Sequence, residues 1–163
     1  MDDMTREILD ILRKDATTAV KDIAAMTGLS QDEVKQTVLA MEKEGIIVKY
    51  NTVVNMEKVD EEYVEALIEV RTTPQREAGF DSLARRIAGF EEVQSVYLMS
   101  GAYDLMVLVG GTSLKKVAMF VSDRLAGLEG VISTATHFVL KKYKEQGAEI
   151  KDGQEDERLV ISP

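Results

Sequence analysis

The stretch over residues 93–111 constrains the fold most, because it predicts two β-strands that fold back on each other. Its first part alternates polar and apolar residues, and its second part, residues 105–109, is wholly apolar. The short polar break between the two parts contains Gly101. A glycine in such a break favours a hairpin, because glycine reaches positive φ angles at no steric cost. The rest of the chain can be placed around this hairpin.

Strands and helices alternate on both sides of the hairpin. Alternating polarity predicts strands over residues 64–73 and 131–142, and apolar residues at helical spacing predict helices over 77–88 and 112–126. This order is the ferredoxin-like βαββαβ arrangement, in which two helices cover one face of an antiparallel sheet. The other face lacks helices of its own, and such half-covered sheets commonly dimerise. Its apolar positions are expected to be Tyr97, Met99, Met106 and Leu108, or the residues that alternate with them.

Three short helices precede this domain. Helical spacing predicts helices over residues 4–14 and 19–28, and Ser30 with Glu33 forms a capping box that begins a third helix. Two short helices joined through Gly28 after a leading helix are typical of a helix-turn-helix. The residues that follow, 46–55, predict a small two-stranded wing. Spacing alone is equally consistent with a helical bundle that makes no nucleic-acid contact.

These elements predict an α+β chain in four parts. A winged helix-turn-helix over residues 1–55 is followed by a charged linker over 56–63 and a ferredoxin-like domain over 64–144. An acidic, turn-rich tail over 145–163 closes the chain and is expected to be mobile. Its apolar residues 158–162 predict a last short strand, and a frayed terminus is the alternative.

The residue types present leave few catalytic or metal sites. The chain has no Cys, which removes disulfides, thiolate ligands and thiol nucleophiles, and its single His, His137, lies mid-strand with no carboxylate beside it in the sequence. We therefore expect no enzyme, no metal and no cofactor. No apolar run approaches the length of a membrane span, and the acidic N-terminus is unlike a signal peptide. We expect a cytoplasmic protein.

The two halves in this order resemble the Lrp/AsnC family of bacterial and archaeal regulators. The resemblance covers nearly the whole chain and is carried by the hairpin motif SGAYD and by the segments ILDILRKDATTAVKDIAAMTGLS, EKEGII, LEGVISTATHFVLK and RLVIS. It implies a transcription regulator that dimerises through its C-terminal sheets, with tetramers or octamers in many members. It also implies that the C-terminal domain senses a free amino acid.

The resemblance places the effector site in the hairpin turn and the last strand of the domain. The corresponding residues are Ser100, Gly101, Ala102, Tyr103 and Asp104, with Thr134 and Thr136. An amino-acid zwitterion needs an acceptor for its ammonium group, which Asp104 offers, and donors for its carboxylate, which hydroxyls and turn N–H groups offer. A second interpretation stays open, in which Asp104 only hydrogen-bonds the turn backbone.

The third helix departs from the family, whose recognition helices are often rich in Arg or Lys. Residues 30–45 contain two Lys and four acidic residues, and the whole chain has a formal net charge of −9, which repels nucleic acid at long range. The DNA-contacting residues are expected to be Gln31, Lys35 and Gln36 on the bases and Lys21, Lys43 and Lys49 on phosphates, together with Ser30 at the start of the helix. Useful affinity for double-stranded DNA is then expected only when several helix-turn-helix units bind together.

Two other functions stay open. One is an amino-acid-binding oligomer with weak or vestigial DNA binding. The other is a sirohaem decarboxylase, which has the same two-part layout, but the lone His137 disfavours it because such enzymes need haem-contacting histidines.

Overall fold

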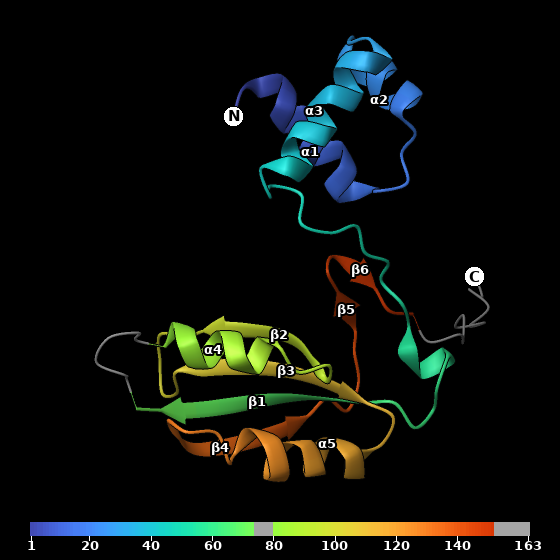
Figure 1. Ribbon diagram of the computed structural model, residues 1–163. Helices are drawn as coiled ribbons and strands as arrows, with labels where there is room; N and C mark the ends of the chain where they lie inside the picture. The colour runs from blue at the N-terminus through green and yellow to red at the C-terminus, as the bar shows by residue number, and fades with distance from the viewer. Residues whose placement is uncertain (74–79, 152–163) are drawn as a thin grey trace, which may run out of the picture. The chain divides into compact units, whose positions relative to one another are not determined.

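The computed structural model describes residues 1–73 and 80–151. The chain divides into two compact units, Met1–Val53 and Val54–Pro163 (Figure 1). The first unit consists of three helices, and the second is built on a four-stranded sheet with helices. None of the helices in the described part is both long and apolar enough to cross a bilayer.

The helical unit packs α1 (Asp3–Lys14), α2 (Val20–Thr27) and α3 (Gln31–Lys43) around one small core. Ile8 of α1 and Val34 of α3 are fully buried at its centre. The remaining buried members of the core are Ile23, Ala24 and Met41. The predicted helix-turn-helix is confirmed, because α2 and α3 are joined only by a short turn.

The turn between α2 and α3 is fixed by local chemistry. Gly28 ends α2 in the left-handed conformation at φ 73°, which glycine adopts without steric cost. Ser30 then caps α3: its backbone N–H and its Oγ donate to Glu33 Oε2 at 2.8 and 2.7 Å, and its Oγ accepts from the Glu33 N–H at 3.3 Å. This reciprocal capping box starts α3 where the sequence predicted.

The prediction of a two-stranded wing is wrong. Residues 46–55 contain no β-strand, and the N–H groups of Ile46 and Ile47 donate instead to the carbonyl oxygen of Met41. Two strands with no further element to cover them are marginally stable. Within the helical unit Ile47 packs against the core, but the next residue, Val48, is 88% exposed.

The sheet unit has the predicted ferredoxin-like topology. Its strands are β1 (Val64–Thr72), β2 (Val93–Leu98), β3 (Leu105–Gly111) and β4 (Val131–Phe138), in the spatial order β2-β3-β1-β4 with antiparallel neighbours. The predicted central hairpin is therefore β2 and β3. Figure 1 shows α4 (Asp81–Ala88) and α5 (Leu114–Phe120) lying over the same sheet. A single π-helical turn, η2 (Val121–Leu125), continues α5.

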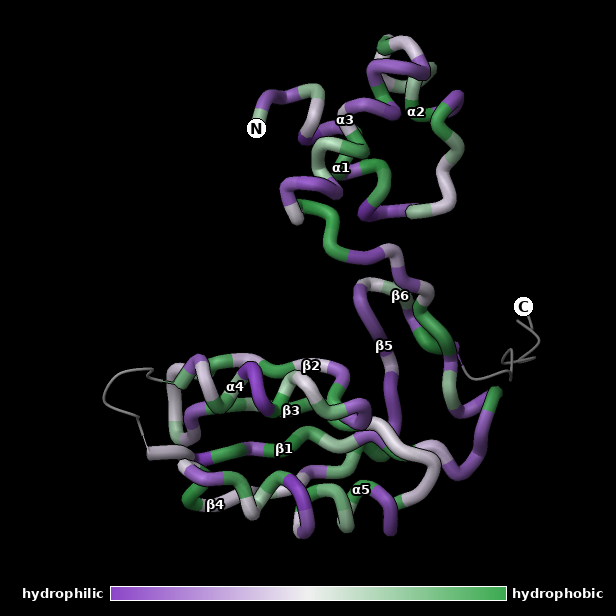
Figure 2. Tube along the Cα trace, viewed as in Figure 1, coloured by the Kyte–Doolittle hydropathy of each residue, from purple (hydrophilic) through white to green (hydrophobic). Residues whose placement is uncertain are grey.

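Side chains alternate between the two faces of the sheet, as the hydropathy pattern along β1 shows (Figure 2). The face under the helices holds the core, which includes Ile68, Val107 and Leu125 at 0% exposure. The register places Leu67 opposite both Leu108 and His137, on the other face. We call this second surface the open face. Its members from the four strands include Leu67, Glu69, Ser95, Tyr97, Met106, Leu108, Ala135 and His137.

The segments that flank the sheet contain more structure than the sequence predicted. The linker includes a 3-10 helix, η1 (Met56–Lys58). The tail begins with a two-stranded hairpin, β5 (Lys144–Glu145) and β6 (Ala148–Glu149), where we expected a mobile acidic segment. The hairpin turns through Gln146 and Gly147, both at positive φ. The strand predicted over residues 158–162 lies outside the described residues.

The capping box predicts a pH dependence for the helical unit. The Ser30 hydroxyl, and then the Ser30 backbone N–H, hold the pKa of Glu33 below its ordinary value of 4.5. A carboxyl with a lowered pKa in the folded state adds stability above its unfolded pKa, and that stability is lost as the pH falls through the folded pKa. We expect the wild-type Tm, followed by circular dichroism, to fall more steeply below about pH 4.5 than that of Glu33→Gln. Glutamine preserves the capping geometry without titrating. Identical pH profiles for the two proteins would contradict this role of Glu33.

Candidate functional site

The seven residues predicted to contact DNA are all exposed in the helical unit. Gln31, Lys35 and Gln36 lie in the first half of α3, beginning directly after the capped turn. Ser30 is engaged by the capping box, so its side chain holds the helix start rather than extending outward. The other predicted residues are Lys21 on α2, Lys43 at the end of α3 and Lys49 beyond it.

Acidic side chains accompany these candidates. Lys35 Nζ lies 3.8 Å from Asp32 Oδ1, one turn earlier on α3. Glu42, at the other end of the helix, accepts a hydrogen bond from the Tyr50 hydroxyl at 2.9 Å. The electrostatic attraction of α3 for phosphate is therefore weak, because each lysine of this helix has acidic neighbours in the sequence.

In the sheet unit, Asp104 joins the hairpin turn to the neighbouring strand. The pairing of β1 with β3 ends at Val70 and Leu105. Beyond this pair, Asp104 Oδ2 accepts a hydrogen bond from the backbone N–H of Thr72 on β1 at 2.7 Å. The Asp104 N–H donates to the carbonyl oxygen of Val70 at 3.1 Å, and its own carbonyl oxygen accepts from the Met99 N–H at 2.8 Å. Asp104 thus fixes the position of the turn against β1, because its carboxylate accepts from the backbone of β1 rather than from the backbone of its own turn.

The predicted effector residues on β4 reach the same end of the sheet. Thr134 pairs with Val70 and Thr136 with Ile68, so both threonines lie on the helix-covered face and are half-buried. Because β1 lies between β3 and β4, Asp104 and Thr134 flank the same residue, Val70, from its two sides. Two strand spacings separate them, about 10 Å. The structure therefore brings part of the predicted set to one edge without direct contact between turn and threonines.

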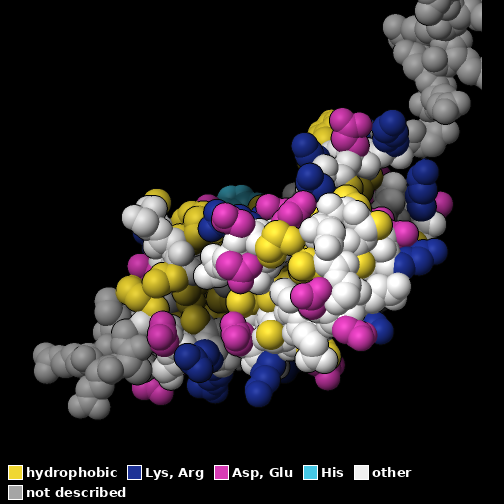
Figure 3. Space-filling model, turned by 90° about the horizontal axis from the view of Figure 1, so that it is seen from above, with side chains coloured by type: hydrophobic (Ala, Val, Ile, Leu, Met, Phe, Trp, Pro, Cys, Tyr) yellow, Lys and Arg dark blue, Asp and Glu magenta, His cyan; other side chains and the backbone are white. Residues whose placement is uncertain are grey.

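The same edge carries exposed apolar side chains. Leu98 and Met99, at the end of β2, are 60% and 39% exposed. Ser100, Gly101 and Ala102 in the turn are exposed, and Tyr103 is half-buried. Figure 3 shows hydrophobic side chains gathered at the left of the view, within the sheet unit.

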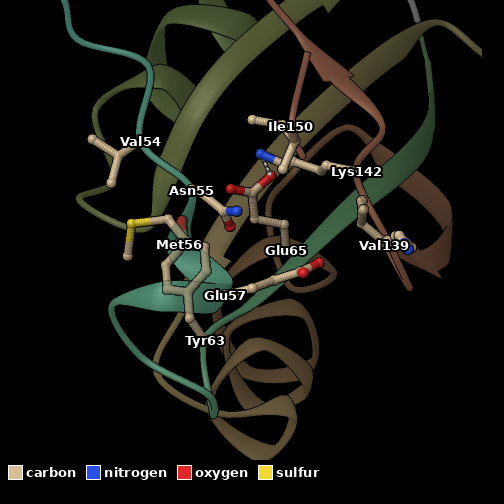
Figure 4. Close-up of a pocket in the computed structure, with 10 residues that line it drawn as sticks. Val54, Asn55, Met56, Glu57, Tyr63, Glu65, Val139, Lys142 and Ile150 are labelled. Carbon is tan, nitrogen blue, oxygen red and sulfur yellow. Dashed lines mark ion pairs between the residues drawn. The ribbon is translucent and has the colours of Figure 1, made fainter. Parts of the chain in front are cut away.

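A separate pocket lies at the other end of β1, and the sequence analysis did not predict it. Its walls come from residues 54–57, the start of β1 and the segment after β4 (Figure 4). Glu65 is only 6% exposed although its position on β1 belongs to the open face. Lys142 covers it, with Nζ 2.5 Å from Glu65 Oε2 and 2.9 Å from Glu145 Oε2. Tyr63 lies beside them, and its hydroxyl accepts from Gln94 Nε2 at 2.6 Å.

The titration of this cluster follows from its burial and charges. Burial alone would lower the pKa of Lys142, but hydrogen bonds and charge attraction to Glu65 and Glu145 together raise it. Burial, and then repulsion by Glu65, raise the pKa of Tyr63. The pocket has a cavity volume of about 50 Å³, which suits a few water molecules rather than an amino acid. We interpret the cluster as a clamp that fastens the β5–β6 hairpin to β1.

Comparison with known proteins assigns both units. Residues 1–42 match the AsnC-type helix-turn-helix domain, and residues 65–149 match the Lrp/AsnC ligand binding domain. The chain is 48% identical to the HTH-type transcriptional regulator YugG of Bacillus subtilis, covering 96% of this chain and 95% of that protein. It is 30% identical to the HTH-type transcriptional regulator LrpA of Pyrococcus abyssi, over 88% of this chain and 99% of that protein.

Solved structures agree on the fold. An AsnC family transcriptional regulator from Agrobacterium tumefaciens is similar at a TM-score of 0.71 with 26% identity, covering 93% of this chain and 97% of that one. The transcriptional regulator NMB0573 of Neisseria meningitidis, in a complex with L-Met, has a TM-score of 0.72 with 22% identity, over 93% of this chain and 96% of that one. The chain therefore belongs to the Lrp/AsnC family of transcriptional regulators, with an AsnC-type helix-turn-helix and a ligand-binding sheet domain, and is not an enzyme.

Proposed function

We propose that this chain is a sequence-specific, cytoplasmic DNA-binding regulator whose oligomeric state or DNA affinity responds to a free amino acid. The observation that carries the proposal is the exposed first half of α3, which begins at a rigid capping box and presents Gln31, Lys35 and Gln36. A helix presented in this way fits the major groove, where amide and ammonium groups read base edges.

The open face supports a homodimer. It carries apolar side chains on neighbouring strands, with Leu67 at 37% and Tyr97 at 53% exposure and Met106 and Leu108 half-buried. A sheet face of this kind buries its apolar area when a second copy packs on it. Further assembly into tetramers or octamers would use other surfaces, among them the exposed Leu98 and Met99 edge.

The hairpin edge is the proposed effector site. The turn residues 100–104 bring N–H groups and the Asp104 carboxylate to an exposed edge with apolar side chains, which suits a zwitterion with an apolar side chain. The complex of NMB0573 with L-Met shows that a protein of the same fold binds an amino acid. Asp104 already holds the Thr72 N–H through one oxygen, so ligand binding there would act directly on the join between the turn and β1.

A second candidate function is an amino-acid-binding oligomer with weak or vestigial DNA binding. The four acidic residues in and around α3 favour it, because they reduce the counterion release that drives DNA binding. The two candidate functions differ in whether the assembled protein binds DNA tightly. Several weak helix-turn-helix units on one assembly can bind DNA tightly together, which the regulator requires and the amino-acid-binding oligomer does not.

The DNA-binding proposal makes a prediction for α3. On a duplex selected by the full chain from a random-sequence library, Gln36→Ala should cost about 1–3 kcal/mol and relax sequence preference. Lys43→Ala should weaken binding to all duplexes alike and reduce the salt slope by about 1 per subunit. Fluorescence anisotropy titrations at several salt concentrations measure both effects, with the exposed Lys115→Ala on α5 as the matched control. Failure to select any duplex would favour the amino-acid-binding oligomer.

The effector proposal makes a prediction for the hairpin. In a thermal-shift screen of the twenty standard amino acids, one or two should raise the Tm of the wild type, because a ligand that binds only the folded state stabilises it. Asp104→Ala should lose that increase. Asp81→Ala, an exposed acid on α4, is the control for the loss of a negative charge. An increase that survives Asp104→Ala would place the effector away from the hairpin.

A further inference from the structure

We propose that the sheet unit has a second small-molecule site, for a zwitterion with an apolar side chain, in the groove between the end of β3 and the α5–η2 helix. We call it the α5 groove. It has a volume of about 420 Å³, within the range of ordinary ligand sites. Its lining combines the backbone of Gly110 and Gly111 with side chains from α5, η2 and Glu92.

An ion pair between two partly exposed side chains lies at the α5 groove. Arg124 Nη1 is 2.7 Å from Glu92 Oε1, and the guanidinium carbon of Arg124 lies 4.4 Å from the centre of the Phe90 ring and 5.9 Å from that of Phe120. The two rings pack edge to face, with their centres 5.5 Å apart. Stacking on an aromatic face holds a guanidinium in one orientation while several of its N–H donors can still bind a carboxylate.

The carboxylate of this pair is incompletely satisfied. Glu92 Oε2 is buried and has no hydrogen-bond donor among the described residues. Buried polar atoms almost always have a partner, so an orphaned carboxylate oxygen beside a cavity requires an explanation. This oxygen is shielded from solvent in the conformation described, so the ammonium group of a ligand would supply the missing donor after the partly exposed Glu92 side chain rotates towards the groove.

The ion pair and its surroundings match an amino acid in charge and in apolar character. Arg124 and Glu92 present one cation and one anion side by side, and an α-amino acid carries the opposite two charges on a single carbon. Lys116 and Asp123 add one further charge of each sign to the lining. The apolar remainder, Val117, Met119 and Phe120, can receive an aliphatic or thioether side chain. The π-helical turn that holds Arg124 is a feature common at functional sites.

The α5 groove is distinct from the hairpin site of the proposed function. Asp104 directly precedes β3, whereas Gly110 and Gly111 end it, so the two sites lie about 20 Å apart along the strand. The inference does not depend on the hairpin site, and either site can exist without the other.

Two methionines report on the two sites separately, because Met119 lines the α5 groove and Met99 lies beside the hairpin turn. Full-length protein with ¹³C-labelled methionine methyl groups is titrated with L-leucine, L-valine, L-phenylalanine and L-methionine, and the signals are assigned by single Met→Leu substitutions. At least one of these amino acids should shift the Met119 signal saturably, with or without Asp104→Ala. Arg124→Leu should weaken that response about tenfold or more, and Arg85→Leu, an exposed arginine on α4, should not.

The ligand's two charges are tested with half-analogues of the amino acid that shifts Met119, one lacking the carboxylate and one lacking the ammonium group. Both should bind about tenfold or more weakly than the amino acid. A Met119 signal that no amino acid shifts, or a shift that Arg124→Leu leaves unchanged, would overturn the proposal. So would half-analogues that bind as well as the amino acid. A failure of the hairpin proposal is distinguishable from a failure of this one. If only the hairpin proposal is wrong, the amino acids leave the Met99 signal unchanged but still shift the Met119 signal.

Discussion

The sheet unit depends on the antiparallel pairing of β1 with β3 and β4, which places alternate side chains of one strand in two different environments. Ile68 and Val70 are completely buried under the helices, whereas their sequence neighbours Leu67 and Glu69 lie on the open face. A slip of one residue in the register would exchange these sets and expose the core. The hydrogen bond from Thr72 to Asp104 and the pair of Lys142 with Glu65 lie near the two ends of β1. Both help to hold β1 in this register.

The same alternation connects folding with function. The helices cover one face of the sheet. The open face retains exposed apolar surface that a second copy of the chain can bury. In the proposed dimer, two copies of α3 are available to one DNA molecule. Because the lysines of α3 stand among acidic residues, a single copy is expected to bind weakly and a joined pair much more tightly. An effector that alters the edge near Asp104 or the α5 groove could therefore change DNA binding without touching the helical unit.

Periodic patterns in the sequence were sufficient to predict α1 to α5, β1 to β4 and the capped start of α3, because each depends on residues close together in the chain, but η1 and the β5–β6 hairpin were not predicted. The wing was predicted wrongly because a strand needs a pairing partner as well as β-propensity. Residues 46–55 have the propensity but form no strand pair. Burial of Glu65 could not be predicted either, since its alternating position indicates exposure and its partner Lys142 is distant in sequence. The Asp104 turn was located correctly, but only the structure shows that it bonds across to β1. The ion pair of Arg124 with Glu92 was also not predicted, because these two residues are distant in the sequence.

Dimerisation through the open face is the central claim, and sedimentation velocity of the full chain tests it most directly. The wild type should sediment as a dimer or a larger assembly at micromolar concentrations. Leu67→Glu should sediment as a monomer with an unchanged circular dichroism spectrum, because it adds a charge beside Glu69 at the centre of the open face. The matched substitution Leu114→Glu, at an exposed position on the helix layer, should leave the assembly intact. A monomeric wild type, or a Leu67→Glu variant that still assembles, would contradict the account.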